Sequence, residues 1–194
     1  SLNLGFAADP MIAAVPGLAV VGFLAANRDG NQPGGLFVQR WVELNKEDGF
    51  PWAYADTKQA SSGTSGQFRD KPAMLATLAA AGTAPLSLSF TVDGQAVTQK
   101  VAAGTLHLAY SNFTGNDPKD SSQIKYLKST NYGATWSNEV KLSASVALNQ
   151  GVSIAADPSG QSLVVVWRSF DFNSNQPNSL AYATSSNGGN SWSK

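Results

Sequence analysis

One pair of neighbouring residues could bind the acidic group of a ligand. Arg69 and Asp70 stand in a short polar segment that ends in Pro72, and a guanidinium can hold a carboxylate through two parallel hydrogen bonds. Asp9 has a comparable place before a proline nearer the N-terminus, so the pattern also fits a turn that leads into a strand. Arg168 follows an apolar run and could reach a loop. We therefore treat Arg69, Asp70, Asp9 and Arg168 as ligand-binding candidates.

Few other residues have the types that catalysis usually requires. The chain has no cysteine, which excludes disulfides, thiolate catalysis and cysteine-ligated zinc. Its single histidine, His107, disfavours a histidine-based metal site and a Ser-His-Asp triad. His107 lies in an apolar, strand-like run, so a hydrogen-bonded structural role is the simpler interpretation. No catalytic residue can be named, and neither a metal nor a cofactor is expected.

Composition limits the class of protein. With 194 residues, of which 42% are hydrophobic, the chain can build a sizeable core. Its formal net charge is zero, so it lacks the basic excess that holds a nucleic-acid backbone. The longest apolar stretch, residues 11–26, is interrupted by Pro16 and Gly17 and is short for a membrane span. We interpret it as two strands joined by a turn and do not expect the chain to span a membrane.

An eight-residue pattern recurs along the chain and organises it. Residues 129–136 and 185–192 both have serine first, asparagine third, glycine fifth and tryptophan eighth, and residues 45–52 keep only the last two. The residues that define the pattern are Asn131, Gly133 and Trp136, then Asn187, Gly189 and Trp192, and in the degenerate copy Gly49 and Trp52. Three similar turns predict three similar structural units.

The segments before each copy recur in the same order, as three successive strands. The expected strands are residues 8–15, 18–26 and 35–42, then 71–78, 105–111 and 123–129, then 151–156, 162–169 and 179–184. Residues 72–81 are rich in alanine and leucine and could be helical by propensity, but the repeat favours a strand. Between the first two strands of the second set, two strand-like runs flank Asp93 and Gly94, which predicts an inserted hairpin.

The repeated segments resemble the Asp-box, or bacterial neuraminidase repeat, of sialidase-like β-propellers. In that family the box is a tight turn between the third and fourth strands of a blade, at the periphery and away from the active site. The resemblance implies an all-β propeller of four-stranded antiparallel blades, with about three blades present, half of a six-bladed ring. The blades would span about residues 1–60, 66–145 with a hairpin insertion at 80–104, and 149–194.

Asparagine stands at Asn131 and Asn187 where the family has aspartate. The amide oxygen can still accept backbone N–H groups and close the turn, the glycine permits positive φ, and the tryptophan can bury a large ring between blades. Because the negative charge is lost, metal binding at these turns is disfavoured. We therefore expect the box residues to be structural.

The segment around Arg69 is similar to the Phe-Arg-Ile-Pro motif of sialidases, although it has one more residue before the proline. In the family that arginine holds the carboxylate of the substrate. A sialidase also needs a tyrosine nucleophile with a glutamate partner, and an aspartate acid/base. The glutamates here are Glu43, Glu47 and Glu139. Glu47 lies in the degenerate copy and Glu139 follows a complete one, so neither is placed for catalysis and the pair is not identifiable in this chain.

Two functions remain open. The favoured one is an exported, extracytoplasmic binding or assembly module without catalysis. Its partners would be a carbohydrate or another protein chain that covers the open ends of the propeller. The alternative is a sialidase-like glycoside hydrolase with part of its active site outside this chain.

Overall fold

The computed structural model describes residues 4–27, 34–44, 51–63, 67–114, 121–143, 148–170 and 179–193. Within these ranges every regular element is a β-strand and every strand pairing is antiparallel. No helix in the described ranges has the length and hydrophobicity needed to cross a membrane. The all-β, antiparallel class predicted from the sequence is therefore confirmed.

Sheet 1 consists of four strands that pair in chain order: β1 (Phe6–Val15), β2 (Leu18–Ala26), β3 (Gly35–Glu43) and β4 (Trp52–Ser62). β1 and β2 meet at a turn formed by Pro16 and Gly17, where Gly17 has a φ of 82°. Positive φ costs little at glycine because it has no Cβ. The apolar stretch 11–26 is thus a hairpin, as predicted.

Sheet 2 has the order β5-β8-β9-β10. Its strands are β5 (Gln67–Leu78), β8 (Gly104–Thr114), β9 (Ser122–Ser129) and the two-residue β10 (Val140–Lys141). β5 contains most of the alanine- and leucine-rich segment, and it pairs with β8 from Gln67 to Leu78. Tertiary pairing therefore overrides the helical propensity of this segment.

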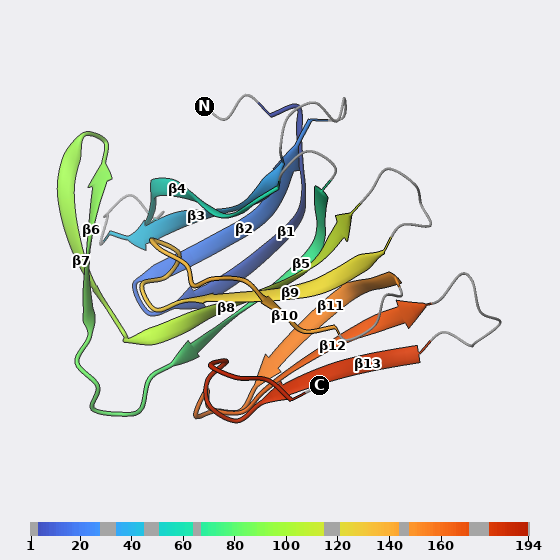
Figure 1. The fold of residues 1–194 in the computed structure, drawn as a ribbon. Helices are drawn as coiled ribbons and strands as arrows, with labels where there is room; N and C mark the ends of the chain where they lie inside the picture. The colour runs from blue at the N-terminus through green and yellow to red at the C-terminus, as the bar shows by residue number, and fades with distance from the viewer. Residues whose placement is uncertain are drawn as a thin grey trace.

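A hairpin lies between β5 and β8 in the sequence. It consists of β6 (Leu86–Val92) and β7 (Gln95–Val101), and Asp93 and Gly94 in its turn both have positive φ, at 50° and 78°. Such angles are those of the turns that match strand twist in two-residue hairpins. Phe90 and Val92 are buried in one core with Leu18 and Val20 of sheet 1, so the hairpin leaves sheet 2 and packs on sheet 1 (Figure 1).

Sheet 3 has three strands, β11 (Leu148–Ala156), β12 (Leu163–Phe170) and β13 (Ser179–Ser185). After β13 the chain turns through residues 185–192, and Ser193 forms an isolated antiparallel bridge with Thr184. The bridge lies on the free edge of β13, the edge that a fourth strand would occupy.

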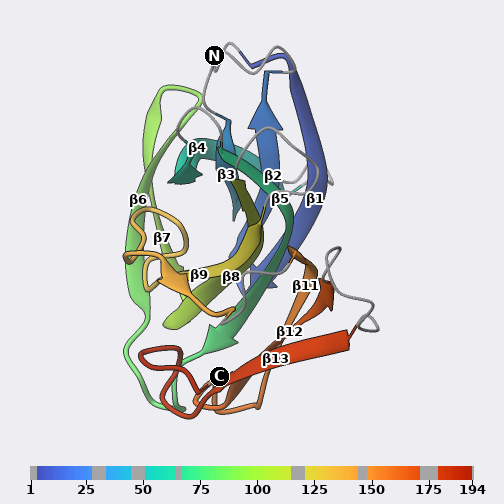
Figure 2. The same cartoon turned by 45° about the vertical axis from the view of Figure 1, so that its right-hand side comes forward.

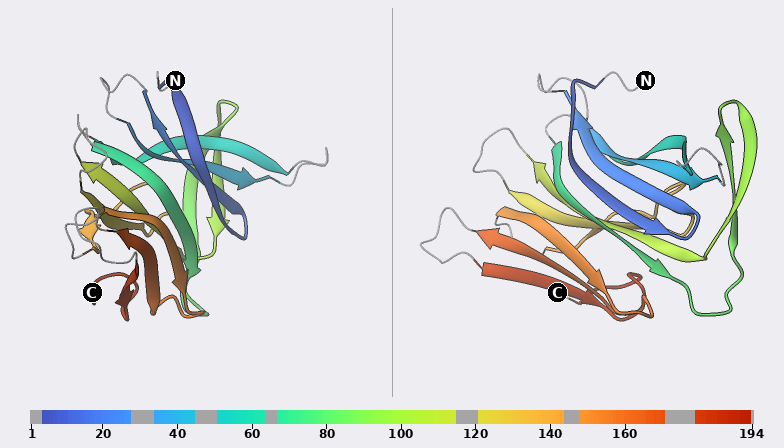
Figure 3. Two further views of the ribbon diagram at one scale, coloured as in Figure 1. Left: turned by 90° about the vertical axis from the view of Figure 1, so that its right-hand side faces the viewer. Right: turned by 180° about the vertical axis from the view of Figure 1, so that it is seen from behind.

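The three sheets follow one another in chain order with their faces packed together (Figure 3). Their first strands are neighbours, since β5 contacts both β1 and β11 (Figure 2). Sheets 1 and 2 share one buried cluster that includes Leu24, Leu36 and Leu108, and sheets 2 and 3 share another that includes Tyr126 and Trp167. Each sheet is thus fixed to the next mainly by apolar side chains.

Candidate functional site

The first strand of every sheet has an irregularity at the same place. The register of the pairing shifts between Ala8 and Met11 in sheet 1, between Asp70 and Ala73 in sheet 2, and between Gln150 and Ser153 in sheet 3. Each shift contains one residue with positive φ: Asp9 at 51°, Lys71 at 47° and Gly151 at 71°. Bulges redirect side chains and are frequent next to functional sites, so this row of bulges is the candidate functional site.

Two of the bulges are joined through Lys71. Its backbone N–H donates to Asp9 Oδ2 at 3.0 Å, and its Nζ donates to Asp70 Oδ2 at 2.5 Å. Lys71 is exposed, and Asp9 and Asp70 are half-buried. We call Asp9, Asp70 and Lys71 the bulge cluster. It presents two carboxylates and one ammonium, groups that can accept from and donate to the hydroxyls of a ligand.

Lys71 was not among the residues singled out from the sequence. It corresponds to Asp9, because both have positive φ and both precede a proline. Alignment of the two segments on Pro10 and Pro72 would have found this equivalence. Positive φ at aspartate or lysine is uncommon, and strained backbone of this kind is often retained where it serves a site.

Arg69 lies beside the bulge, but its side chain points between sheets 1 and 2. It is 6% exposed, its Nε donates to Ser61 Oγ at 2.5 Å, and its Nη2 lies 3.6 Å from Glu139 Oε1. Its guanidinium also lies 5.7 Å from the ring centre of Tyr110, and its Nη1 has no hydrogen-bond partner among the described residues. Arg69 and Asp70 are adjacent in the strand, yet Arg69 contacts residues between the two sheets and Asp70 contacts Lys71 at the bulge.

The sequence did not identify a tyrosine–glutamate pair, but the structure contains one. The Tyr110 hydroxyl donates to Glu139 Oε1 at 2.5 Å, a contact between β8 and the segment before β10 that sequence spacing could not reveal. Tyr110 is fully buried, and burial, together with its hydrogen bond to Glu139, raises the pKa of its hydroxyl. A nucleophile needs access to substrate and a lowered pKa or an adjacent free base, and the buried Tyr110 hydroxyl has neither that access nor a lowered pKa.

The carboxyl of Glu139 is held in its ionised form. Burial opposes ionisation, but hydrogen bonds from Ser61 and Tyr110 and the charge of Arg69 outweigh it and lower the pKa of Glu139. A carboxylate that already accepts from two hydroxyls and faces a guanidinium has little free capacity to act as a base. The residues Ser61, Arg69, Tyr110 and Glu139, which we call the inter-sheet cluster, therefore connect sheets 1 and 2.

Arg168 lies one sheet further along. It is on β12, where it is the cross-strand neighbour of Gln150 at the third bulge. Its exposed guanidinium lies 4.4 Å from the ring centre of Phe170. Within the described ranges, no ion pair joins Arg168 to the bulge cluster. Of the four sequence candidates, the structure thus brings together only Asp9 and Asp70.

The two box turns lie at the opposite end of the sheets and share one hydrogen-bond pattern. Asn131 Oδ1 accepts from the N–H of Thr135 and Asn187 Oδ1 from that of Ser191, both at 2.9 Å. The amide groups donate in turn to the hydroxyls of the same two residues, at 2.9 and 2.8 Å. Asparagine thus closes the turn with both ends of its amide, where a carboxylate could only accept.

Each box turn also contacts the preceding sheet. Trp136 packs against the cores between sheets 1 and 2, and Trp192 packs on Tyr126 with ring centres 4.7 Å apart. A Cβ on Gly189 would lie 2.0 Å from the Tyr126 hydroxyl oxygen, so only glycine fits there. In the degenerate copy, Gly49 lies outside the described residues, and Trp52 is the half-buried first residue of β4.

Comparison with known proteins identifies the fold. No family model and no curated protein matches the chain. Among solved structures, it is similar to the "Hadza microbial sialidase Hz136", with a TM-score of 0.58, 12% sequence identity and 96% of this chain covered. The chain spans 36% of the length of that protein. At this identity the likeness concerns the fold alone, which is sialidase-like.

Proposed function

We propose that the chain forms three blades of an Asp-box β-propeller that binds carbohydrate without catalysis, as an exported, extracytoplasmic module. The sialidase-like fold, the chain-order packing of three sheets and the paired box turns support this proposal. The blades correspond to about residues 1–60, 66–145 and 149–194. They would make up half of a six-bladed ring.

The observation that carries the proposal is the contrast between accessible and buried polar groups. The bulge cluster reaches solvent through the exposed Lys71 and the half-buried Asp9 and Asp70, and it offers hydrogen-bonding groups without a nucleophile, whereas Tyr110 and Glu139 are engaged inside the inter-sheet cluster. With two carboxylates and one ammonium, the bulge cluster has a net charge of −1. A neutral saccharide therefore suits it better than an acidic one.

A binding experiment tests the proposal. Lactose, maltose and cellobiose are titrated against the chain by calorimetry, with sialyllactose as the acidic comparison. We expect a neutral sugar to bind more tightly than sialyllactose, and Asp9→Asn and Asp70→Asn to weaken binding at least tenfold. Asp93→Asn, which removes a carboxylate from the hairpin turn, is the control and should leave binding unchanged. Absence of binding by all three neutral sugars at millimolar concentration would refute the proposal.

The outer faces of sheets 1 and 3 support a second part of the proposal. Leu180 and Tyr182 on β13 are 77% and 65% exposed, and Phe23, Phe37 and Tyr54 line an open cavity on sheet 1. Apolar patches of this kind usually meet a partner. We propose that further blades, in the same or another protein chain, cover both faces. Leu180→Ser with Tyr182→Ser should reduce self-association of the isolated chain in sedimentation velocity, and unchanged self-association would count against coverage of sheet 3.

The fold resemblance favours one alternative function, a sialidase-like glycoside hydrolase with part of its site outside this chain. Its test is turnover of a fluorogenic sialoside by the protein. Turnover that is lost in Arg69→Lys, at an unchanged melting temperature, would decide for the hydrolase. Under the binding proposal we expect no turnover above that of a buffer blank.

A further inference from the structure

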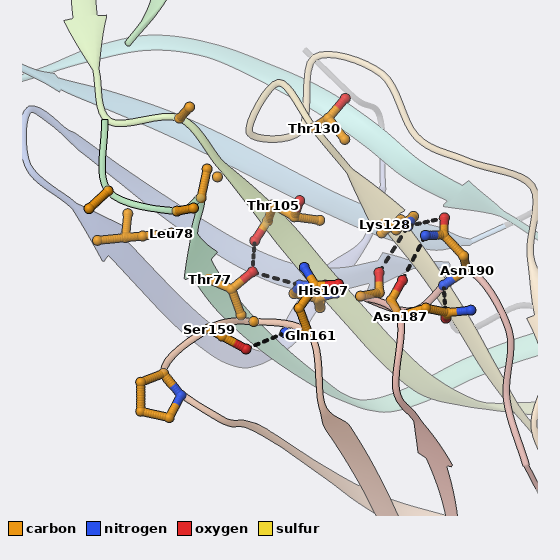
Figure 4. Close-up of a pocket in the computed structure, with 18 of the residues that line it drawn as sticks. Thr77, Leu78, Thr105, His107, Lys128, Thr130, Ser159, Gln161, Asn187 and Asn190 are labelled. Carbon is orange, nitrogen blue, oxygen red and sulfur yellow. Dashed lines mark hydrogen bonds between the residues drawn. The ribbon is translucent and has the colours of Figure 1, made fainter. Parts of the chain in front are cut away.

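A cavity of about 790 Å³ lies between sheets 2 and 3, at the end that carries the second complete box turn. Its walls come from the end of β5, the start of β8, the stem of the hairpin, the turn before β12 and the box turn 185–192. Figure 4 shows Thr77, His107, Lys128, Gln161 and Asn190 around it. The bulge cluster lies near the starts of β1 and β5, so this cavity is separate from the candidate site.

The charge of the cavity wall is uneven. Among the described residues that line it, Lys128 is the one cationic side chain, and none is an aspartate or glutamate. The Lys128 Nζ donates to Gly188 O at 2.9 Å and to Asn190 Oδ1 at 2.7 Å. An ammonium has three N–H donors, so one remains. Among the described residues, no carboxylate lies within ion-pair distance of this amine.

His107 lies next to Lys128, as its direct cross-strand neighbour. It is fully buried, with Nε2 at 2.9 Å from Thr77 Oγ1 and Nδ1 at 2.7 Å from the Tyr126 hydroxyl. Burial, and then the charge of Lys128, lower the pKa of His107 to about 4. Near neutral pH the imidazole is therefore uncharged, and the ammonium of Lys128 is left as the single charge of the cavity wall.

Hydroxyl and amide groups make up much of the remaining polar wall. Thr105, Thr130, Ser159 and Gln161 contribute them. Such groups can bind the hydroxyls of a small polar molecule. An ammonium that has no ion-pair partner can bind one anionic group. We propose that this cavity binds a small, hydroxyl-rich molecule with a single carboxylate or phosphate, and that Lys128 is the charge partner of that group.

The two hydrogen bonds of Lys128 also tie the box turn to sheet 2, so a purely structural role must be distinguished from binding. A structural lysine would affect the melting temperature but would not make the cavity responsive to anions. A binding lysine would do so, and the response would depend on the charge of the probe.

The single histidine of the chain provides a reporter within the cavity. The pKa of His107 is measured by ¹H–¹³C NMR with ¹³C-histidine in the full chain, alone and with glucuronate, glucose 6-phosphate or glucose. We expect glucuronate and glucose 6-phosphate to raise this pKa, because an anion beside Lys128 offsets the charge that opposes protonation. Glucose, which has the hydroxyls without the anion, should leave it unchanged or nearly so.

Matched variants complete the test. Lys128→Gln keeps an N–H donor for the box turn and removes the charge, so it should weaken glucuronate binding at least tenfold. Lys100→Gln removes a lysine from β7, away from the cavity wall, and should bind as the parent chain does. The proposal is wrong if neither anion at 50 mM moves the His107 resonances or the amide signals of Gly160 and Gly188. It is equally wrong if Lys128→Gln and Lys100→Gln bind glucuronate alike.

Discussion

The two ends of the sheets repeat in different ways. At the box end both the residues and the geometry recur, since Asn131 and Asn187 make the same hydrogen bonds in equivalent turns. At the bulge end only the geometry recurs, because Asp9, Lys71 and Gly151 have similar φ but different side chains. The same side chains recur at the box end because each box turn has the same structural role of holding neighbouring sheets together. The side chains differ at the bulge end although the backbone is similar, which fits a binding role in which each sheet contributes different groups.

The largest expected effect contrasts two glycines, one at each end. Gly189→Ala places a Cβ at 2.0 Å from the Tyr126 hydroxyl at a φ of 78°, so overlap adds to backbone strain and the free energy of unfolding should fall by about 3 kcal/mol or more. Gly151 has a φ of 71° with no atom near its Cβ position. Gly151→Ala should therefore cost roughly 1 kcal/mol. Urea unfolding measures the free energy of unfolding of both variants. Equal losses would show that the box turn at Gly189 is no more tightly packed than the bulge at Gly151.

The second-largest expected effect is a loss of stability in acid, caused by protonation of His107 near the box end. His107 has a pKa of about 4 in the folded chain and 6.5 as its ordinary value, so the unfolded chain binds more protons in this interval. Stability is then complete above pH 6.5 and falls by roughly 2 to 3 kcal/mol as the pH decreases to 4. Urea unfolding measured across this range checks the slope.

His107→Gln is the control for that slope, because glutamine does not titrate and the decline should be much shallower. Glu139 and Asp56 also have lowered pKa values, so their contributions are lost only below their ordinary values of 4.5 and 3.8. A slope between pH 6.5 and 5 that survives in His107→Gln would show that another group is responsible.

A third contrast uses neighbouring residues on β5. Arg69→Leu leaves Ser61 and Glu139 without their cationic donor inside the inter-sheet cluster, and should lower the free energy of unfolding by about 2 kcal/mol, a value reduced because Glu139 is partly exposed. Asp70→Asn should change stability by less than about 0.5 kcal/mol and act on sugar binding instead. If Asp70→Asn destabilised the chain as much as Arg69→Leu, the bulge cluster would be structural too.

The smallest expected effect has the opposite sign. Lys71→Gly relieves the cost of a φ of 47° and should stabilise the chain by about 0.5 kcal/mol, while sugar binding weakens because the ammonium is lost. Lys100→Gly, in the regular part of β7, should instead destabilise by about 0.5 to 1 kcal/mol. Thermal unfolding of the two variants compares them, and loss of stability in both would show that the bulge at Lys71 is not strained.

Much of the fold could be predicted because short segments of sequence indicate the order of strands and turns. The repeat predicted a strand at β5 despite its helical composition, and proline, glycine and the repeated tryptophan marked the turns. The site was less accessible to sequence reasoning. The tyrosine partner of Glu139 lies 29 residues away, on β8. The burial of Arg69 beside the partly exposed Asp70 depends on strand alternation at a bulge, which residue types do not reveal.

The β6–β7 hairpin has a consequence for how the molecule comes apart. Its chain belongs to sheet 2, yet Phe90 and Val92 are buried with residues of sheet 1, so neither sheet can separate without pulling that apolar surface into water. No comparable insertion within the described ranges spans sheets 2 and 3. We expect sheets 1 and 2 to open as one cooperative unit and sheet 3 to detach earlier, which native-state amide exchange would record as faster labelling of β12 than of β2.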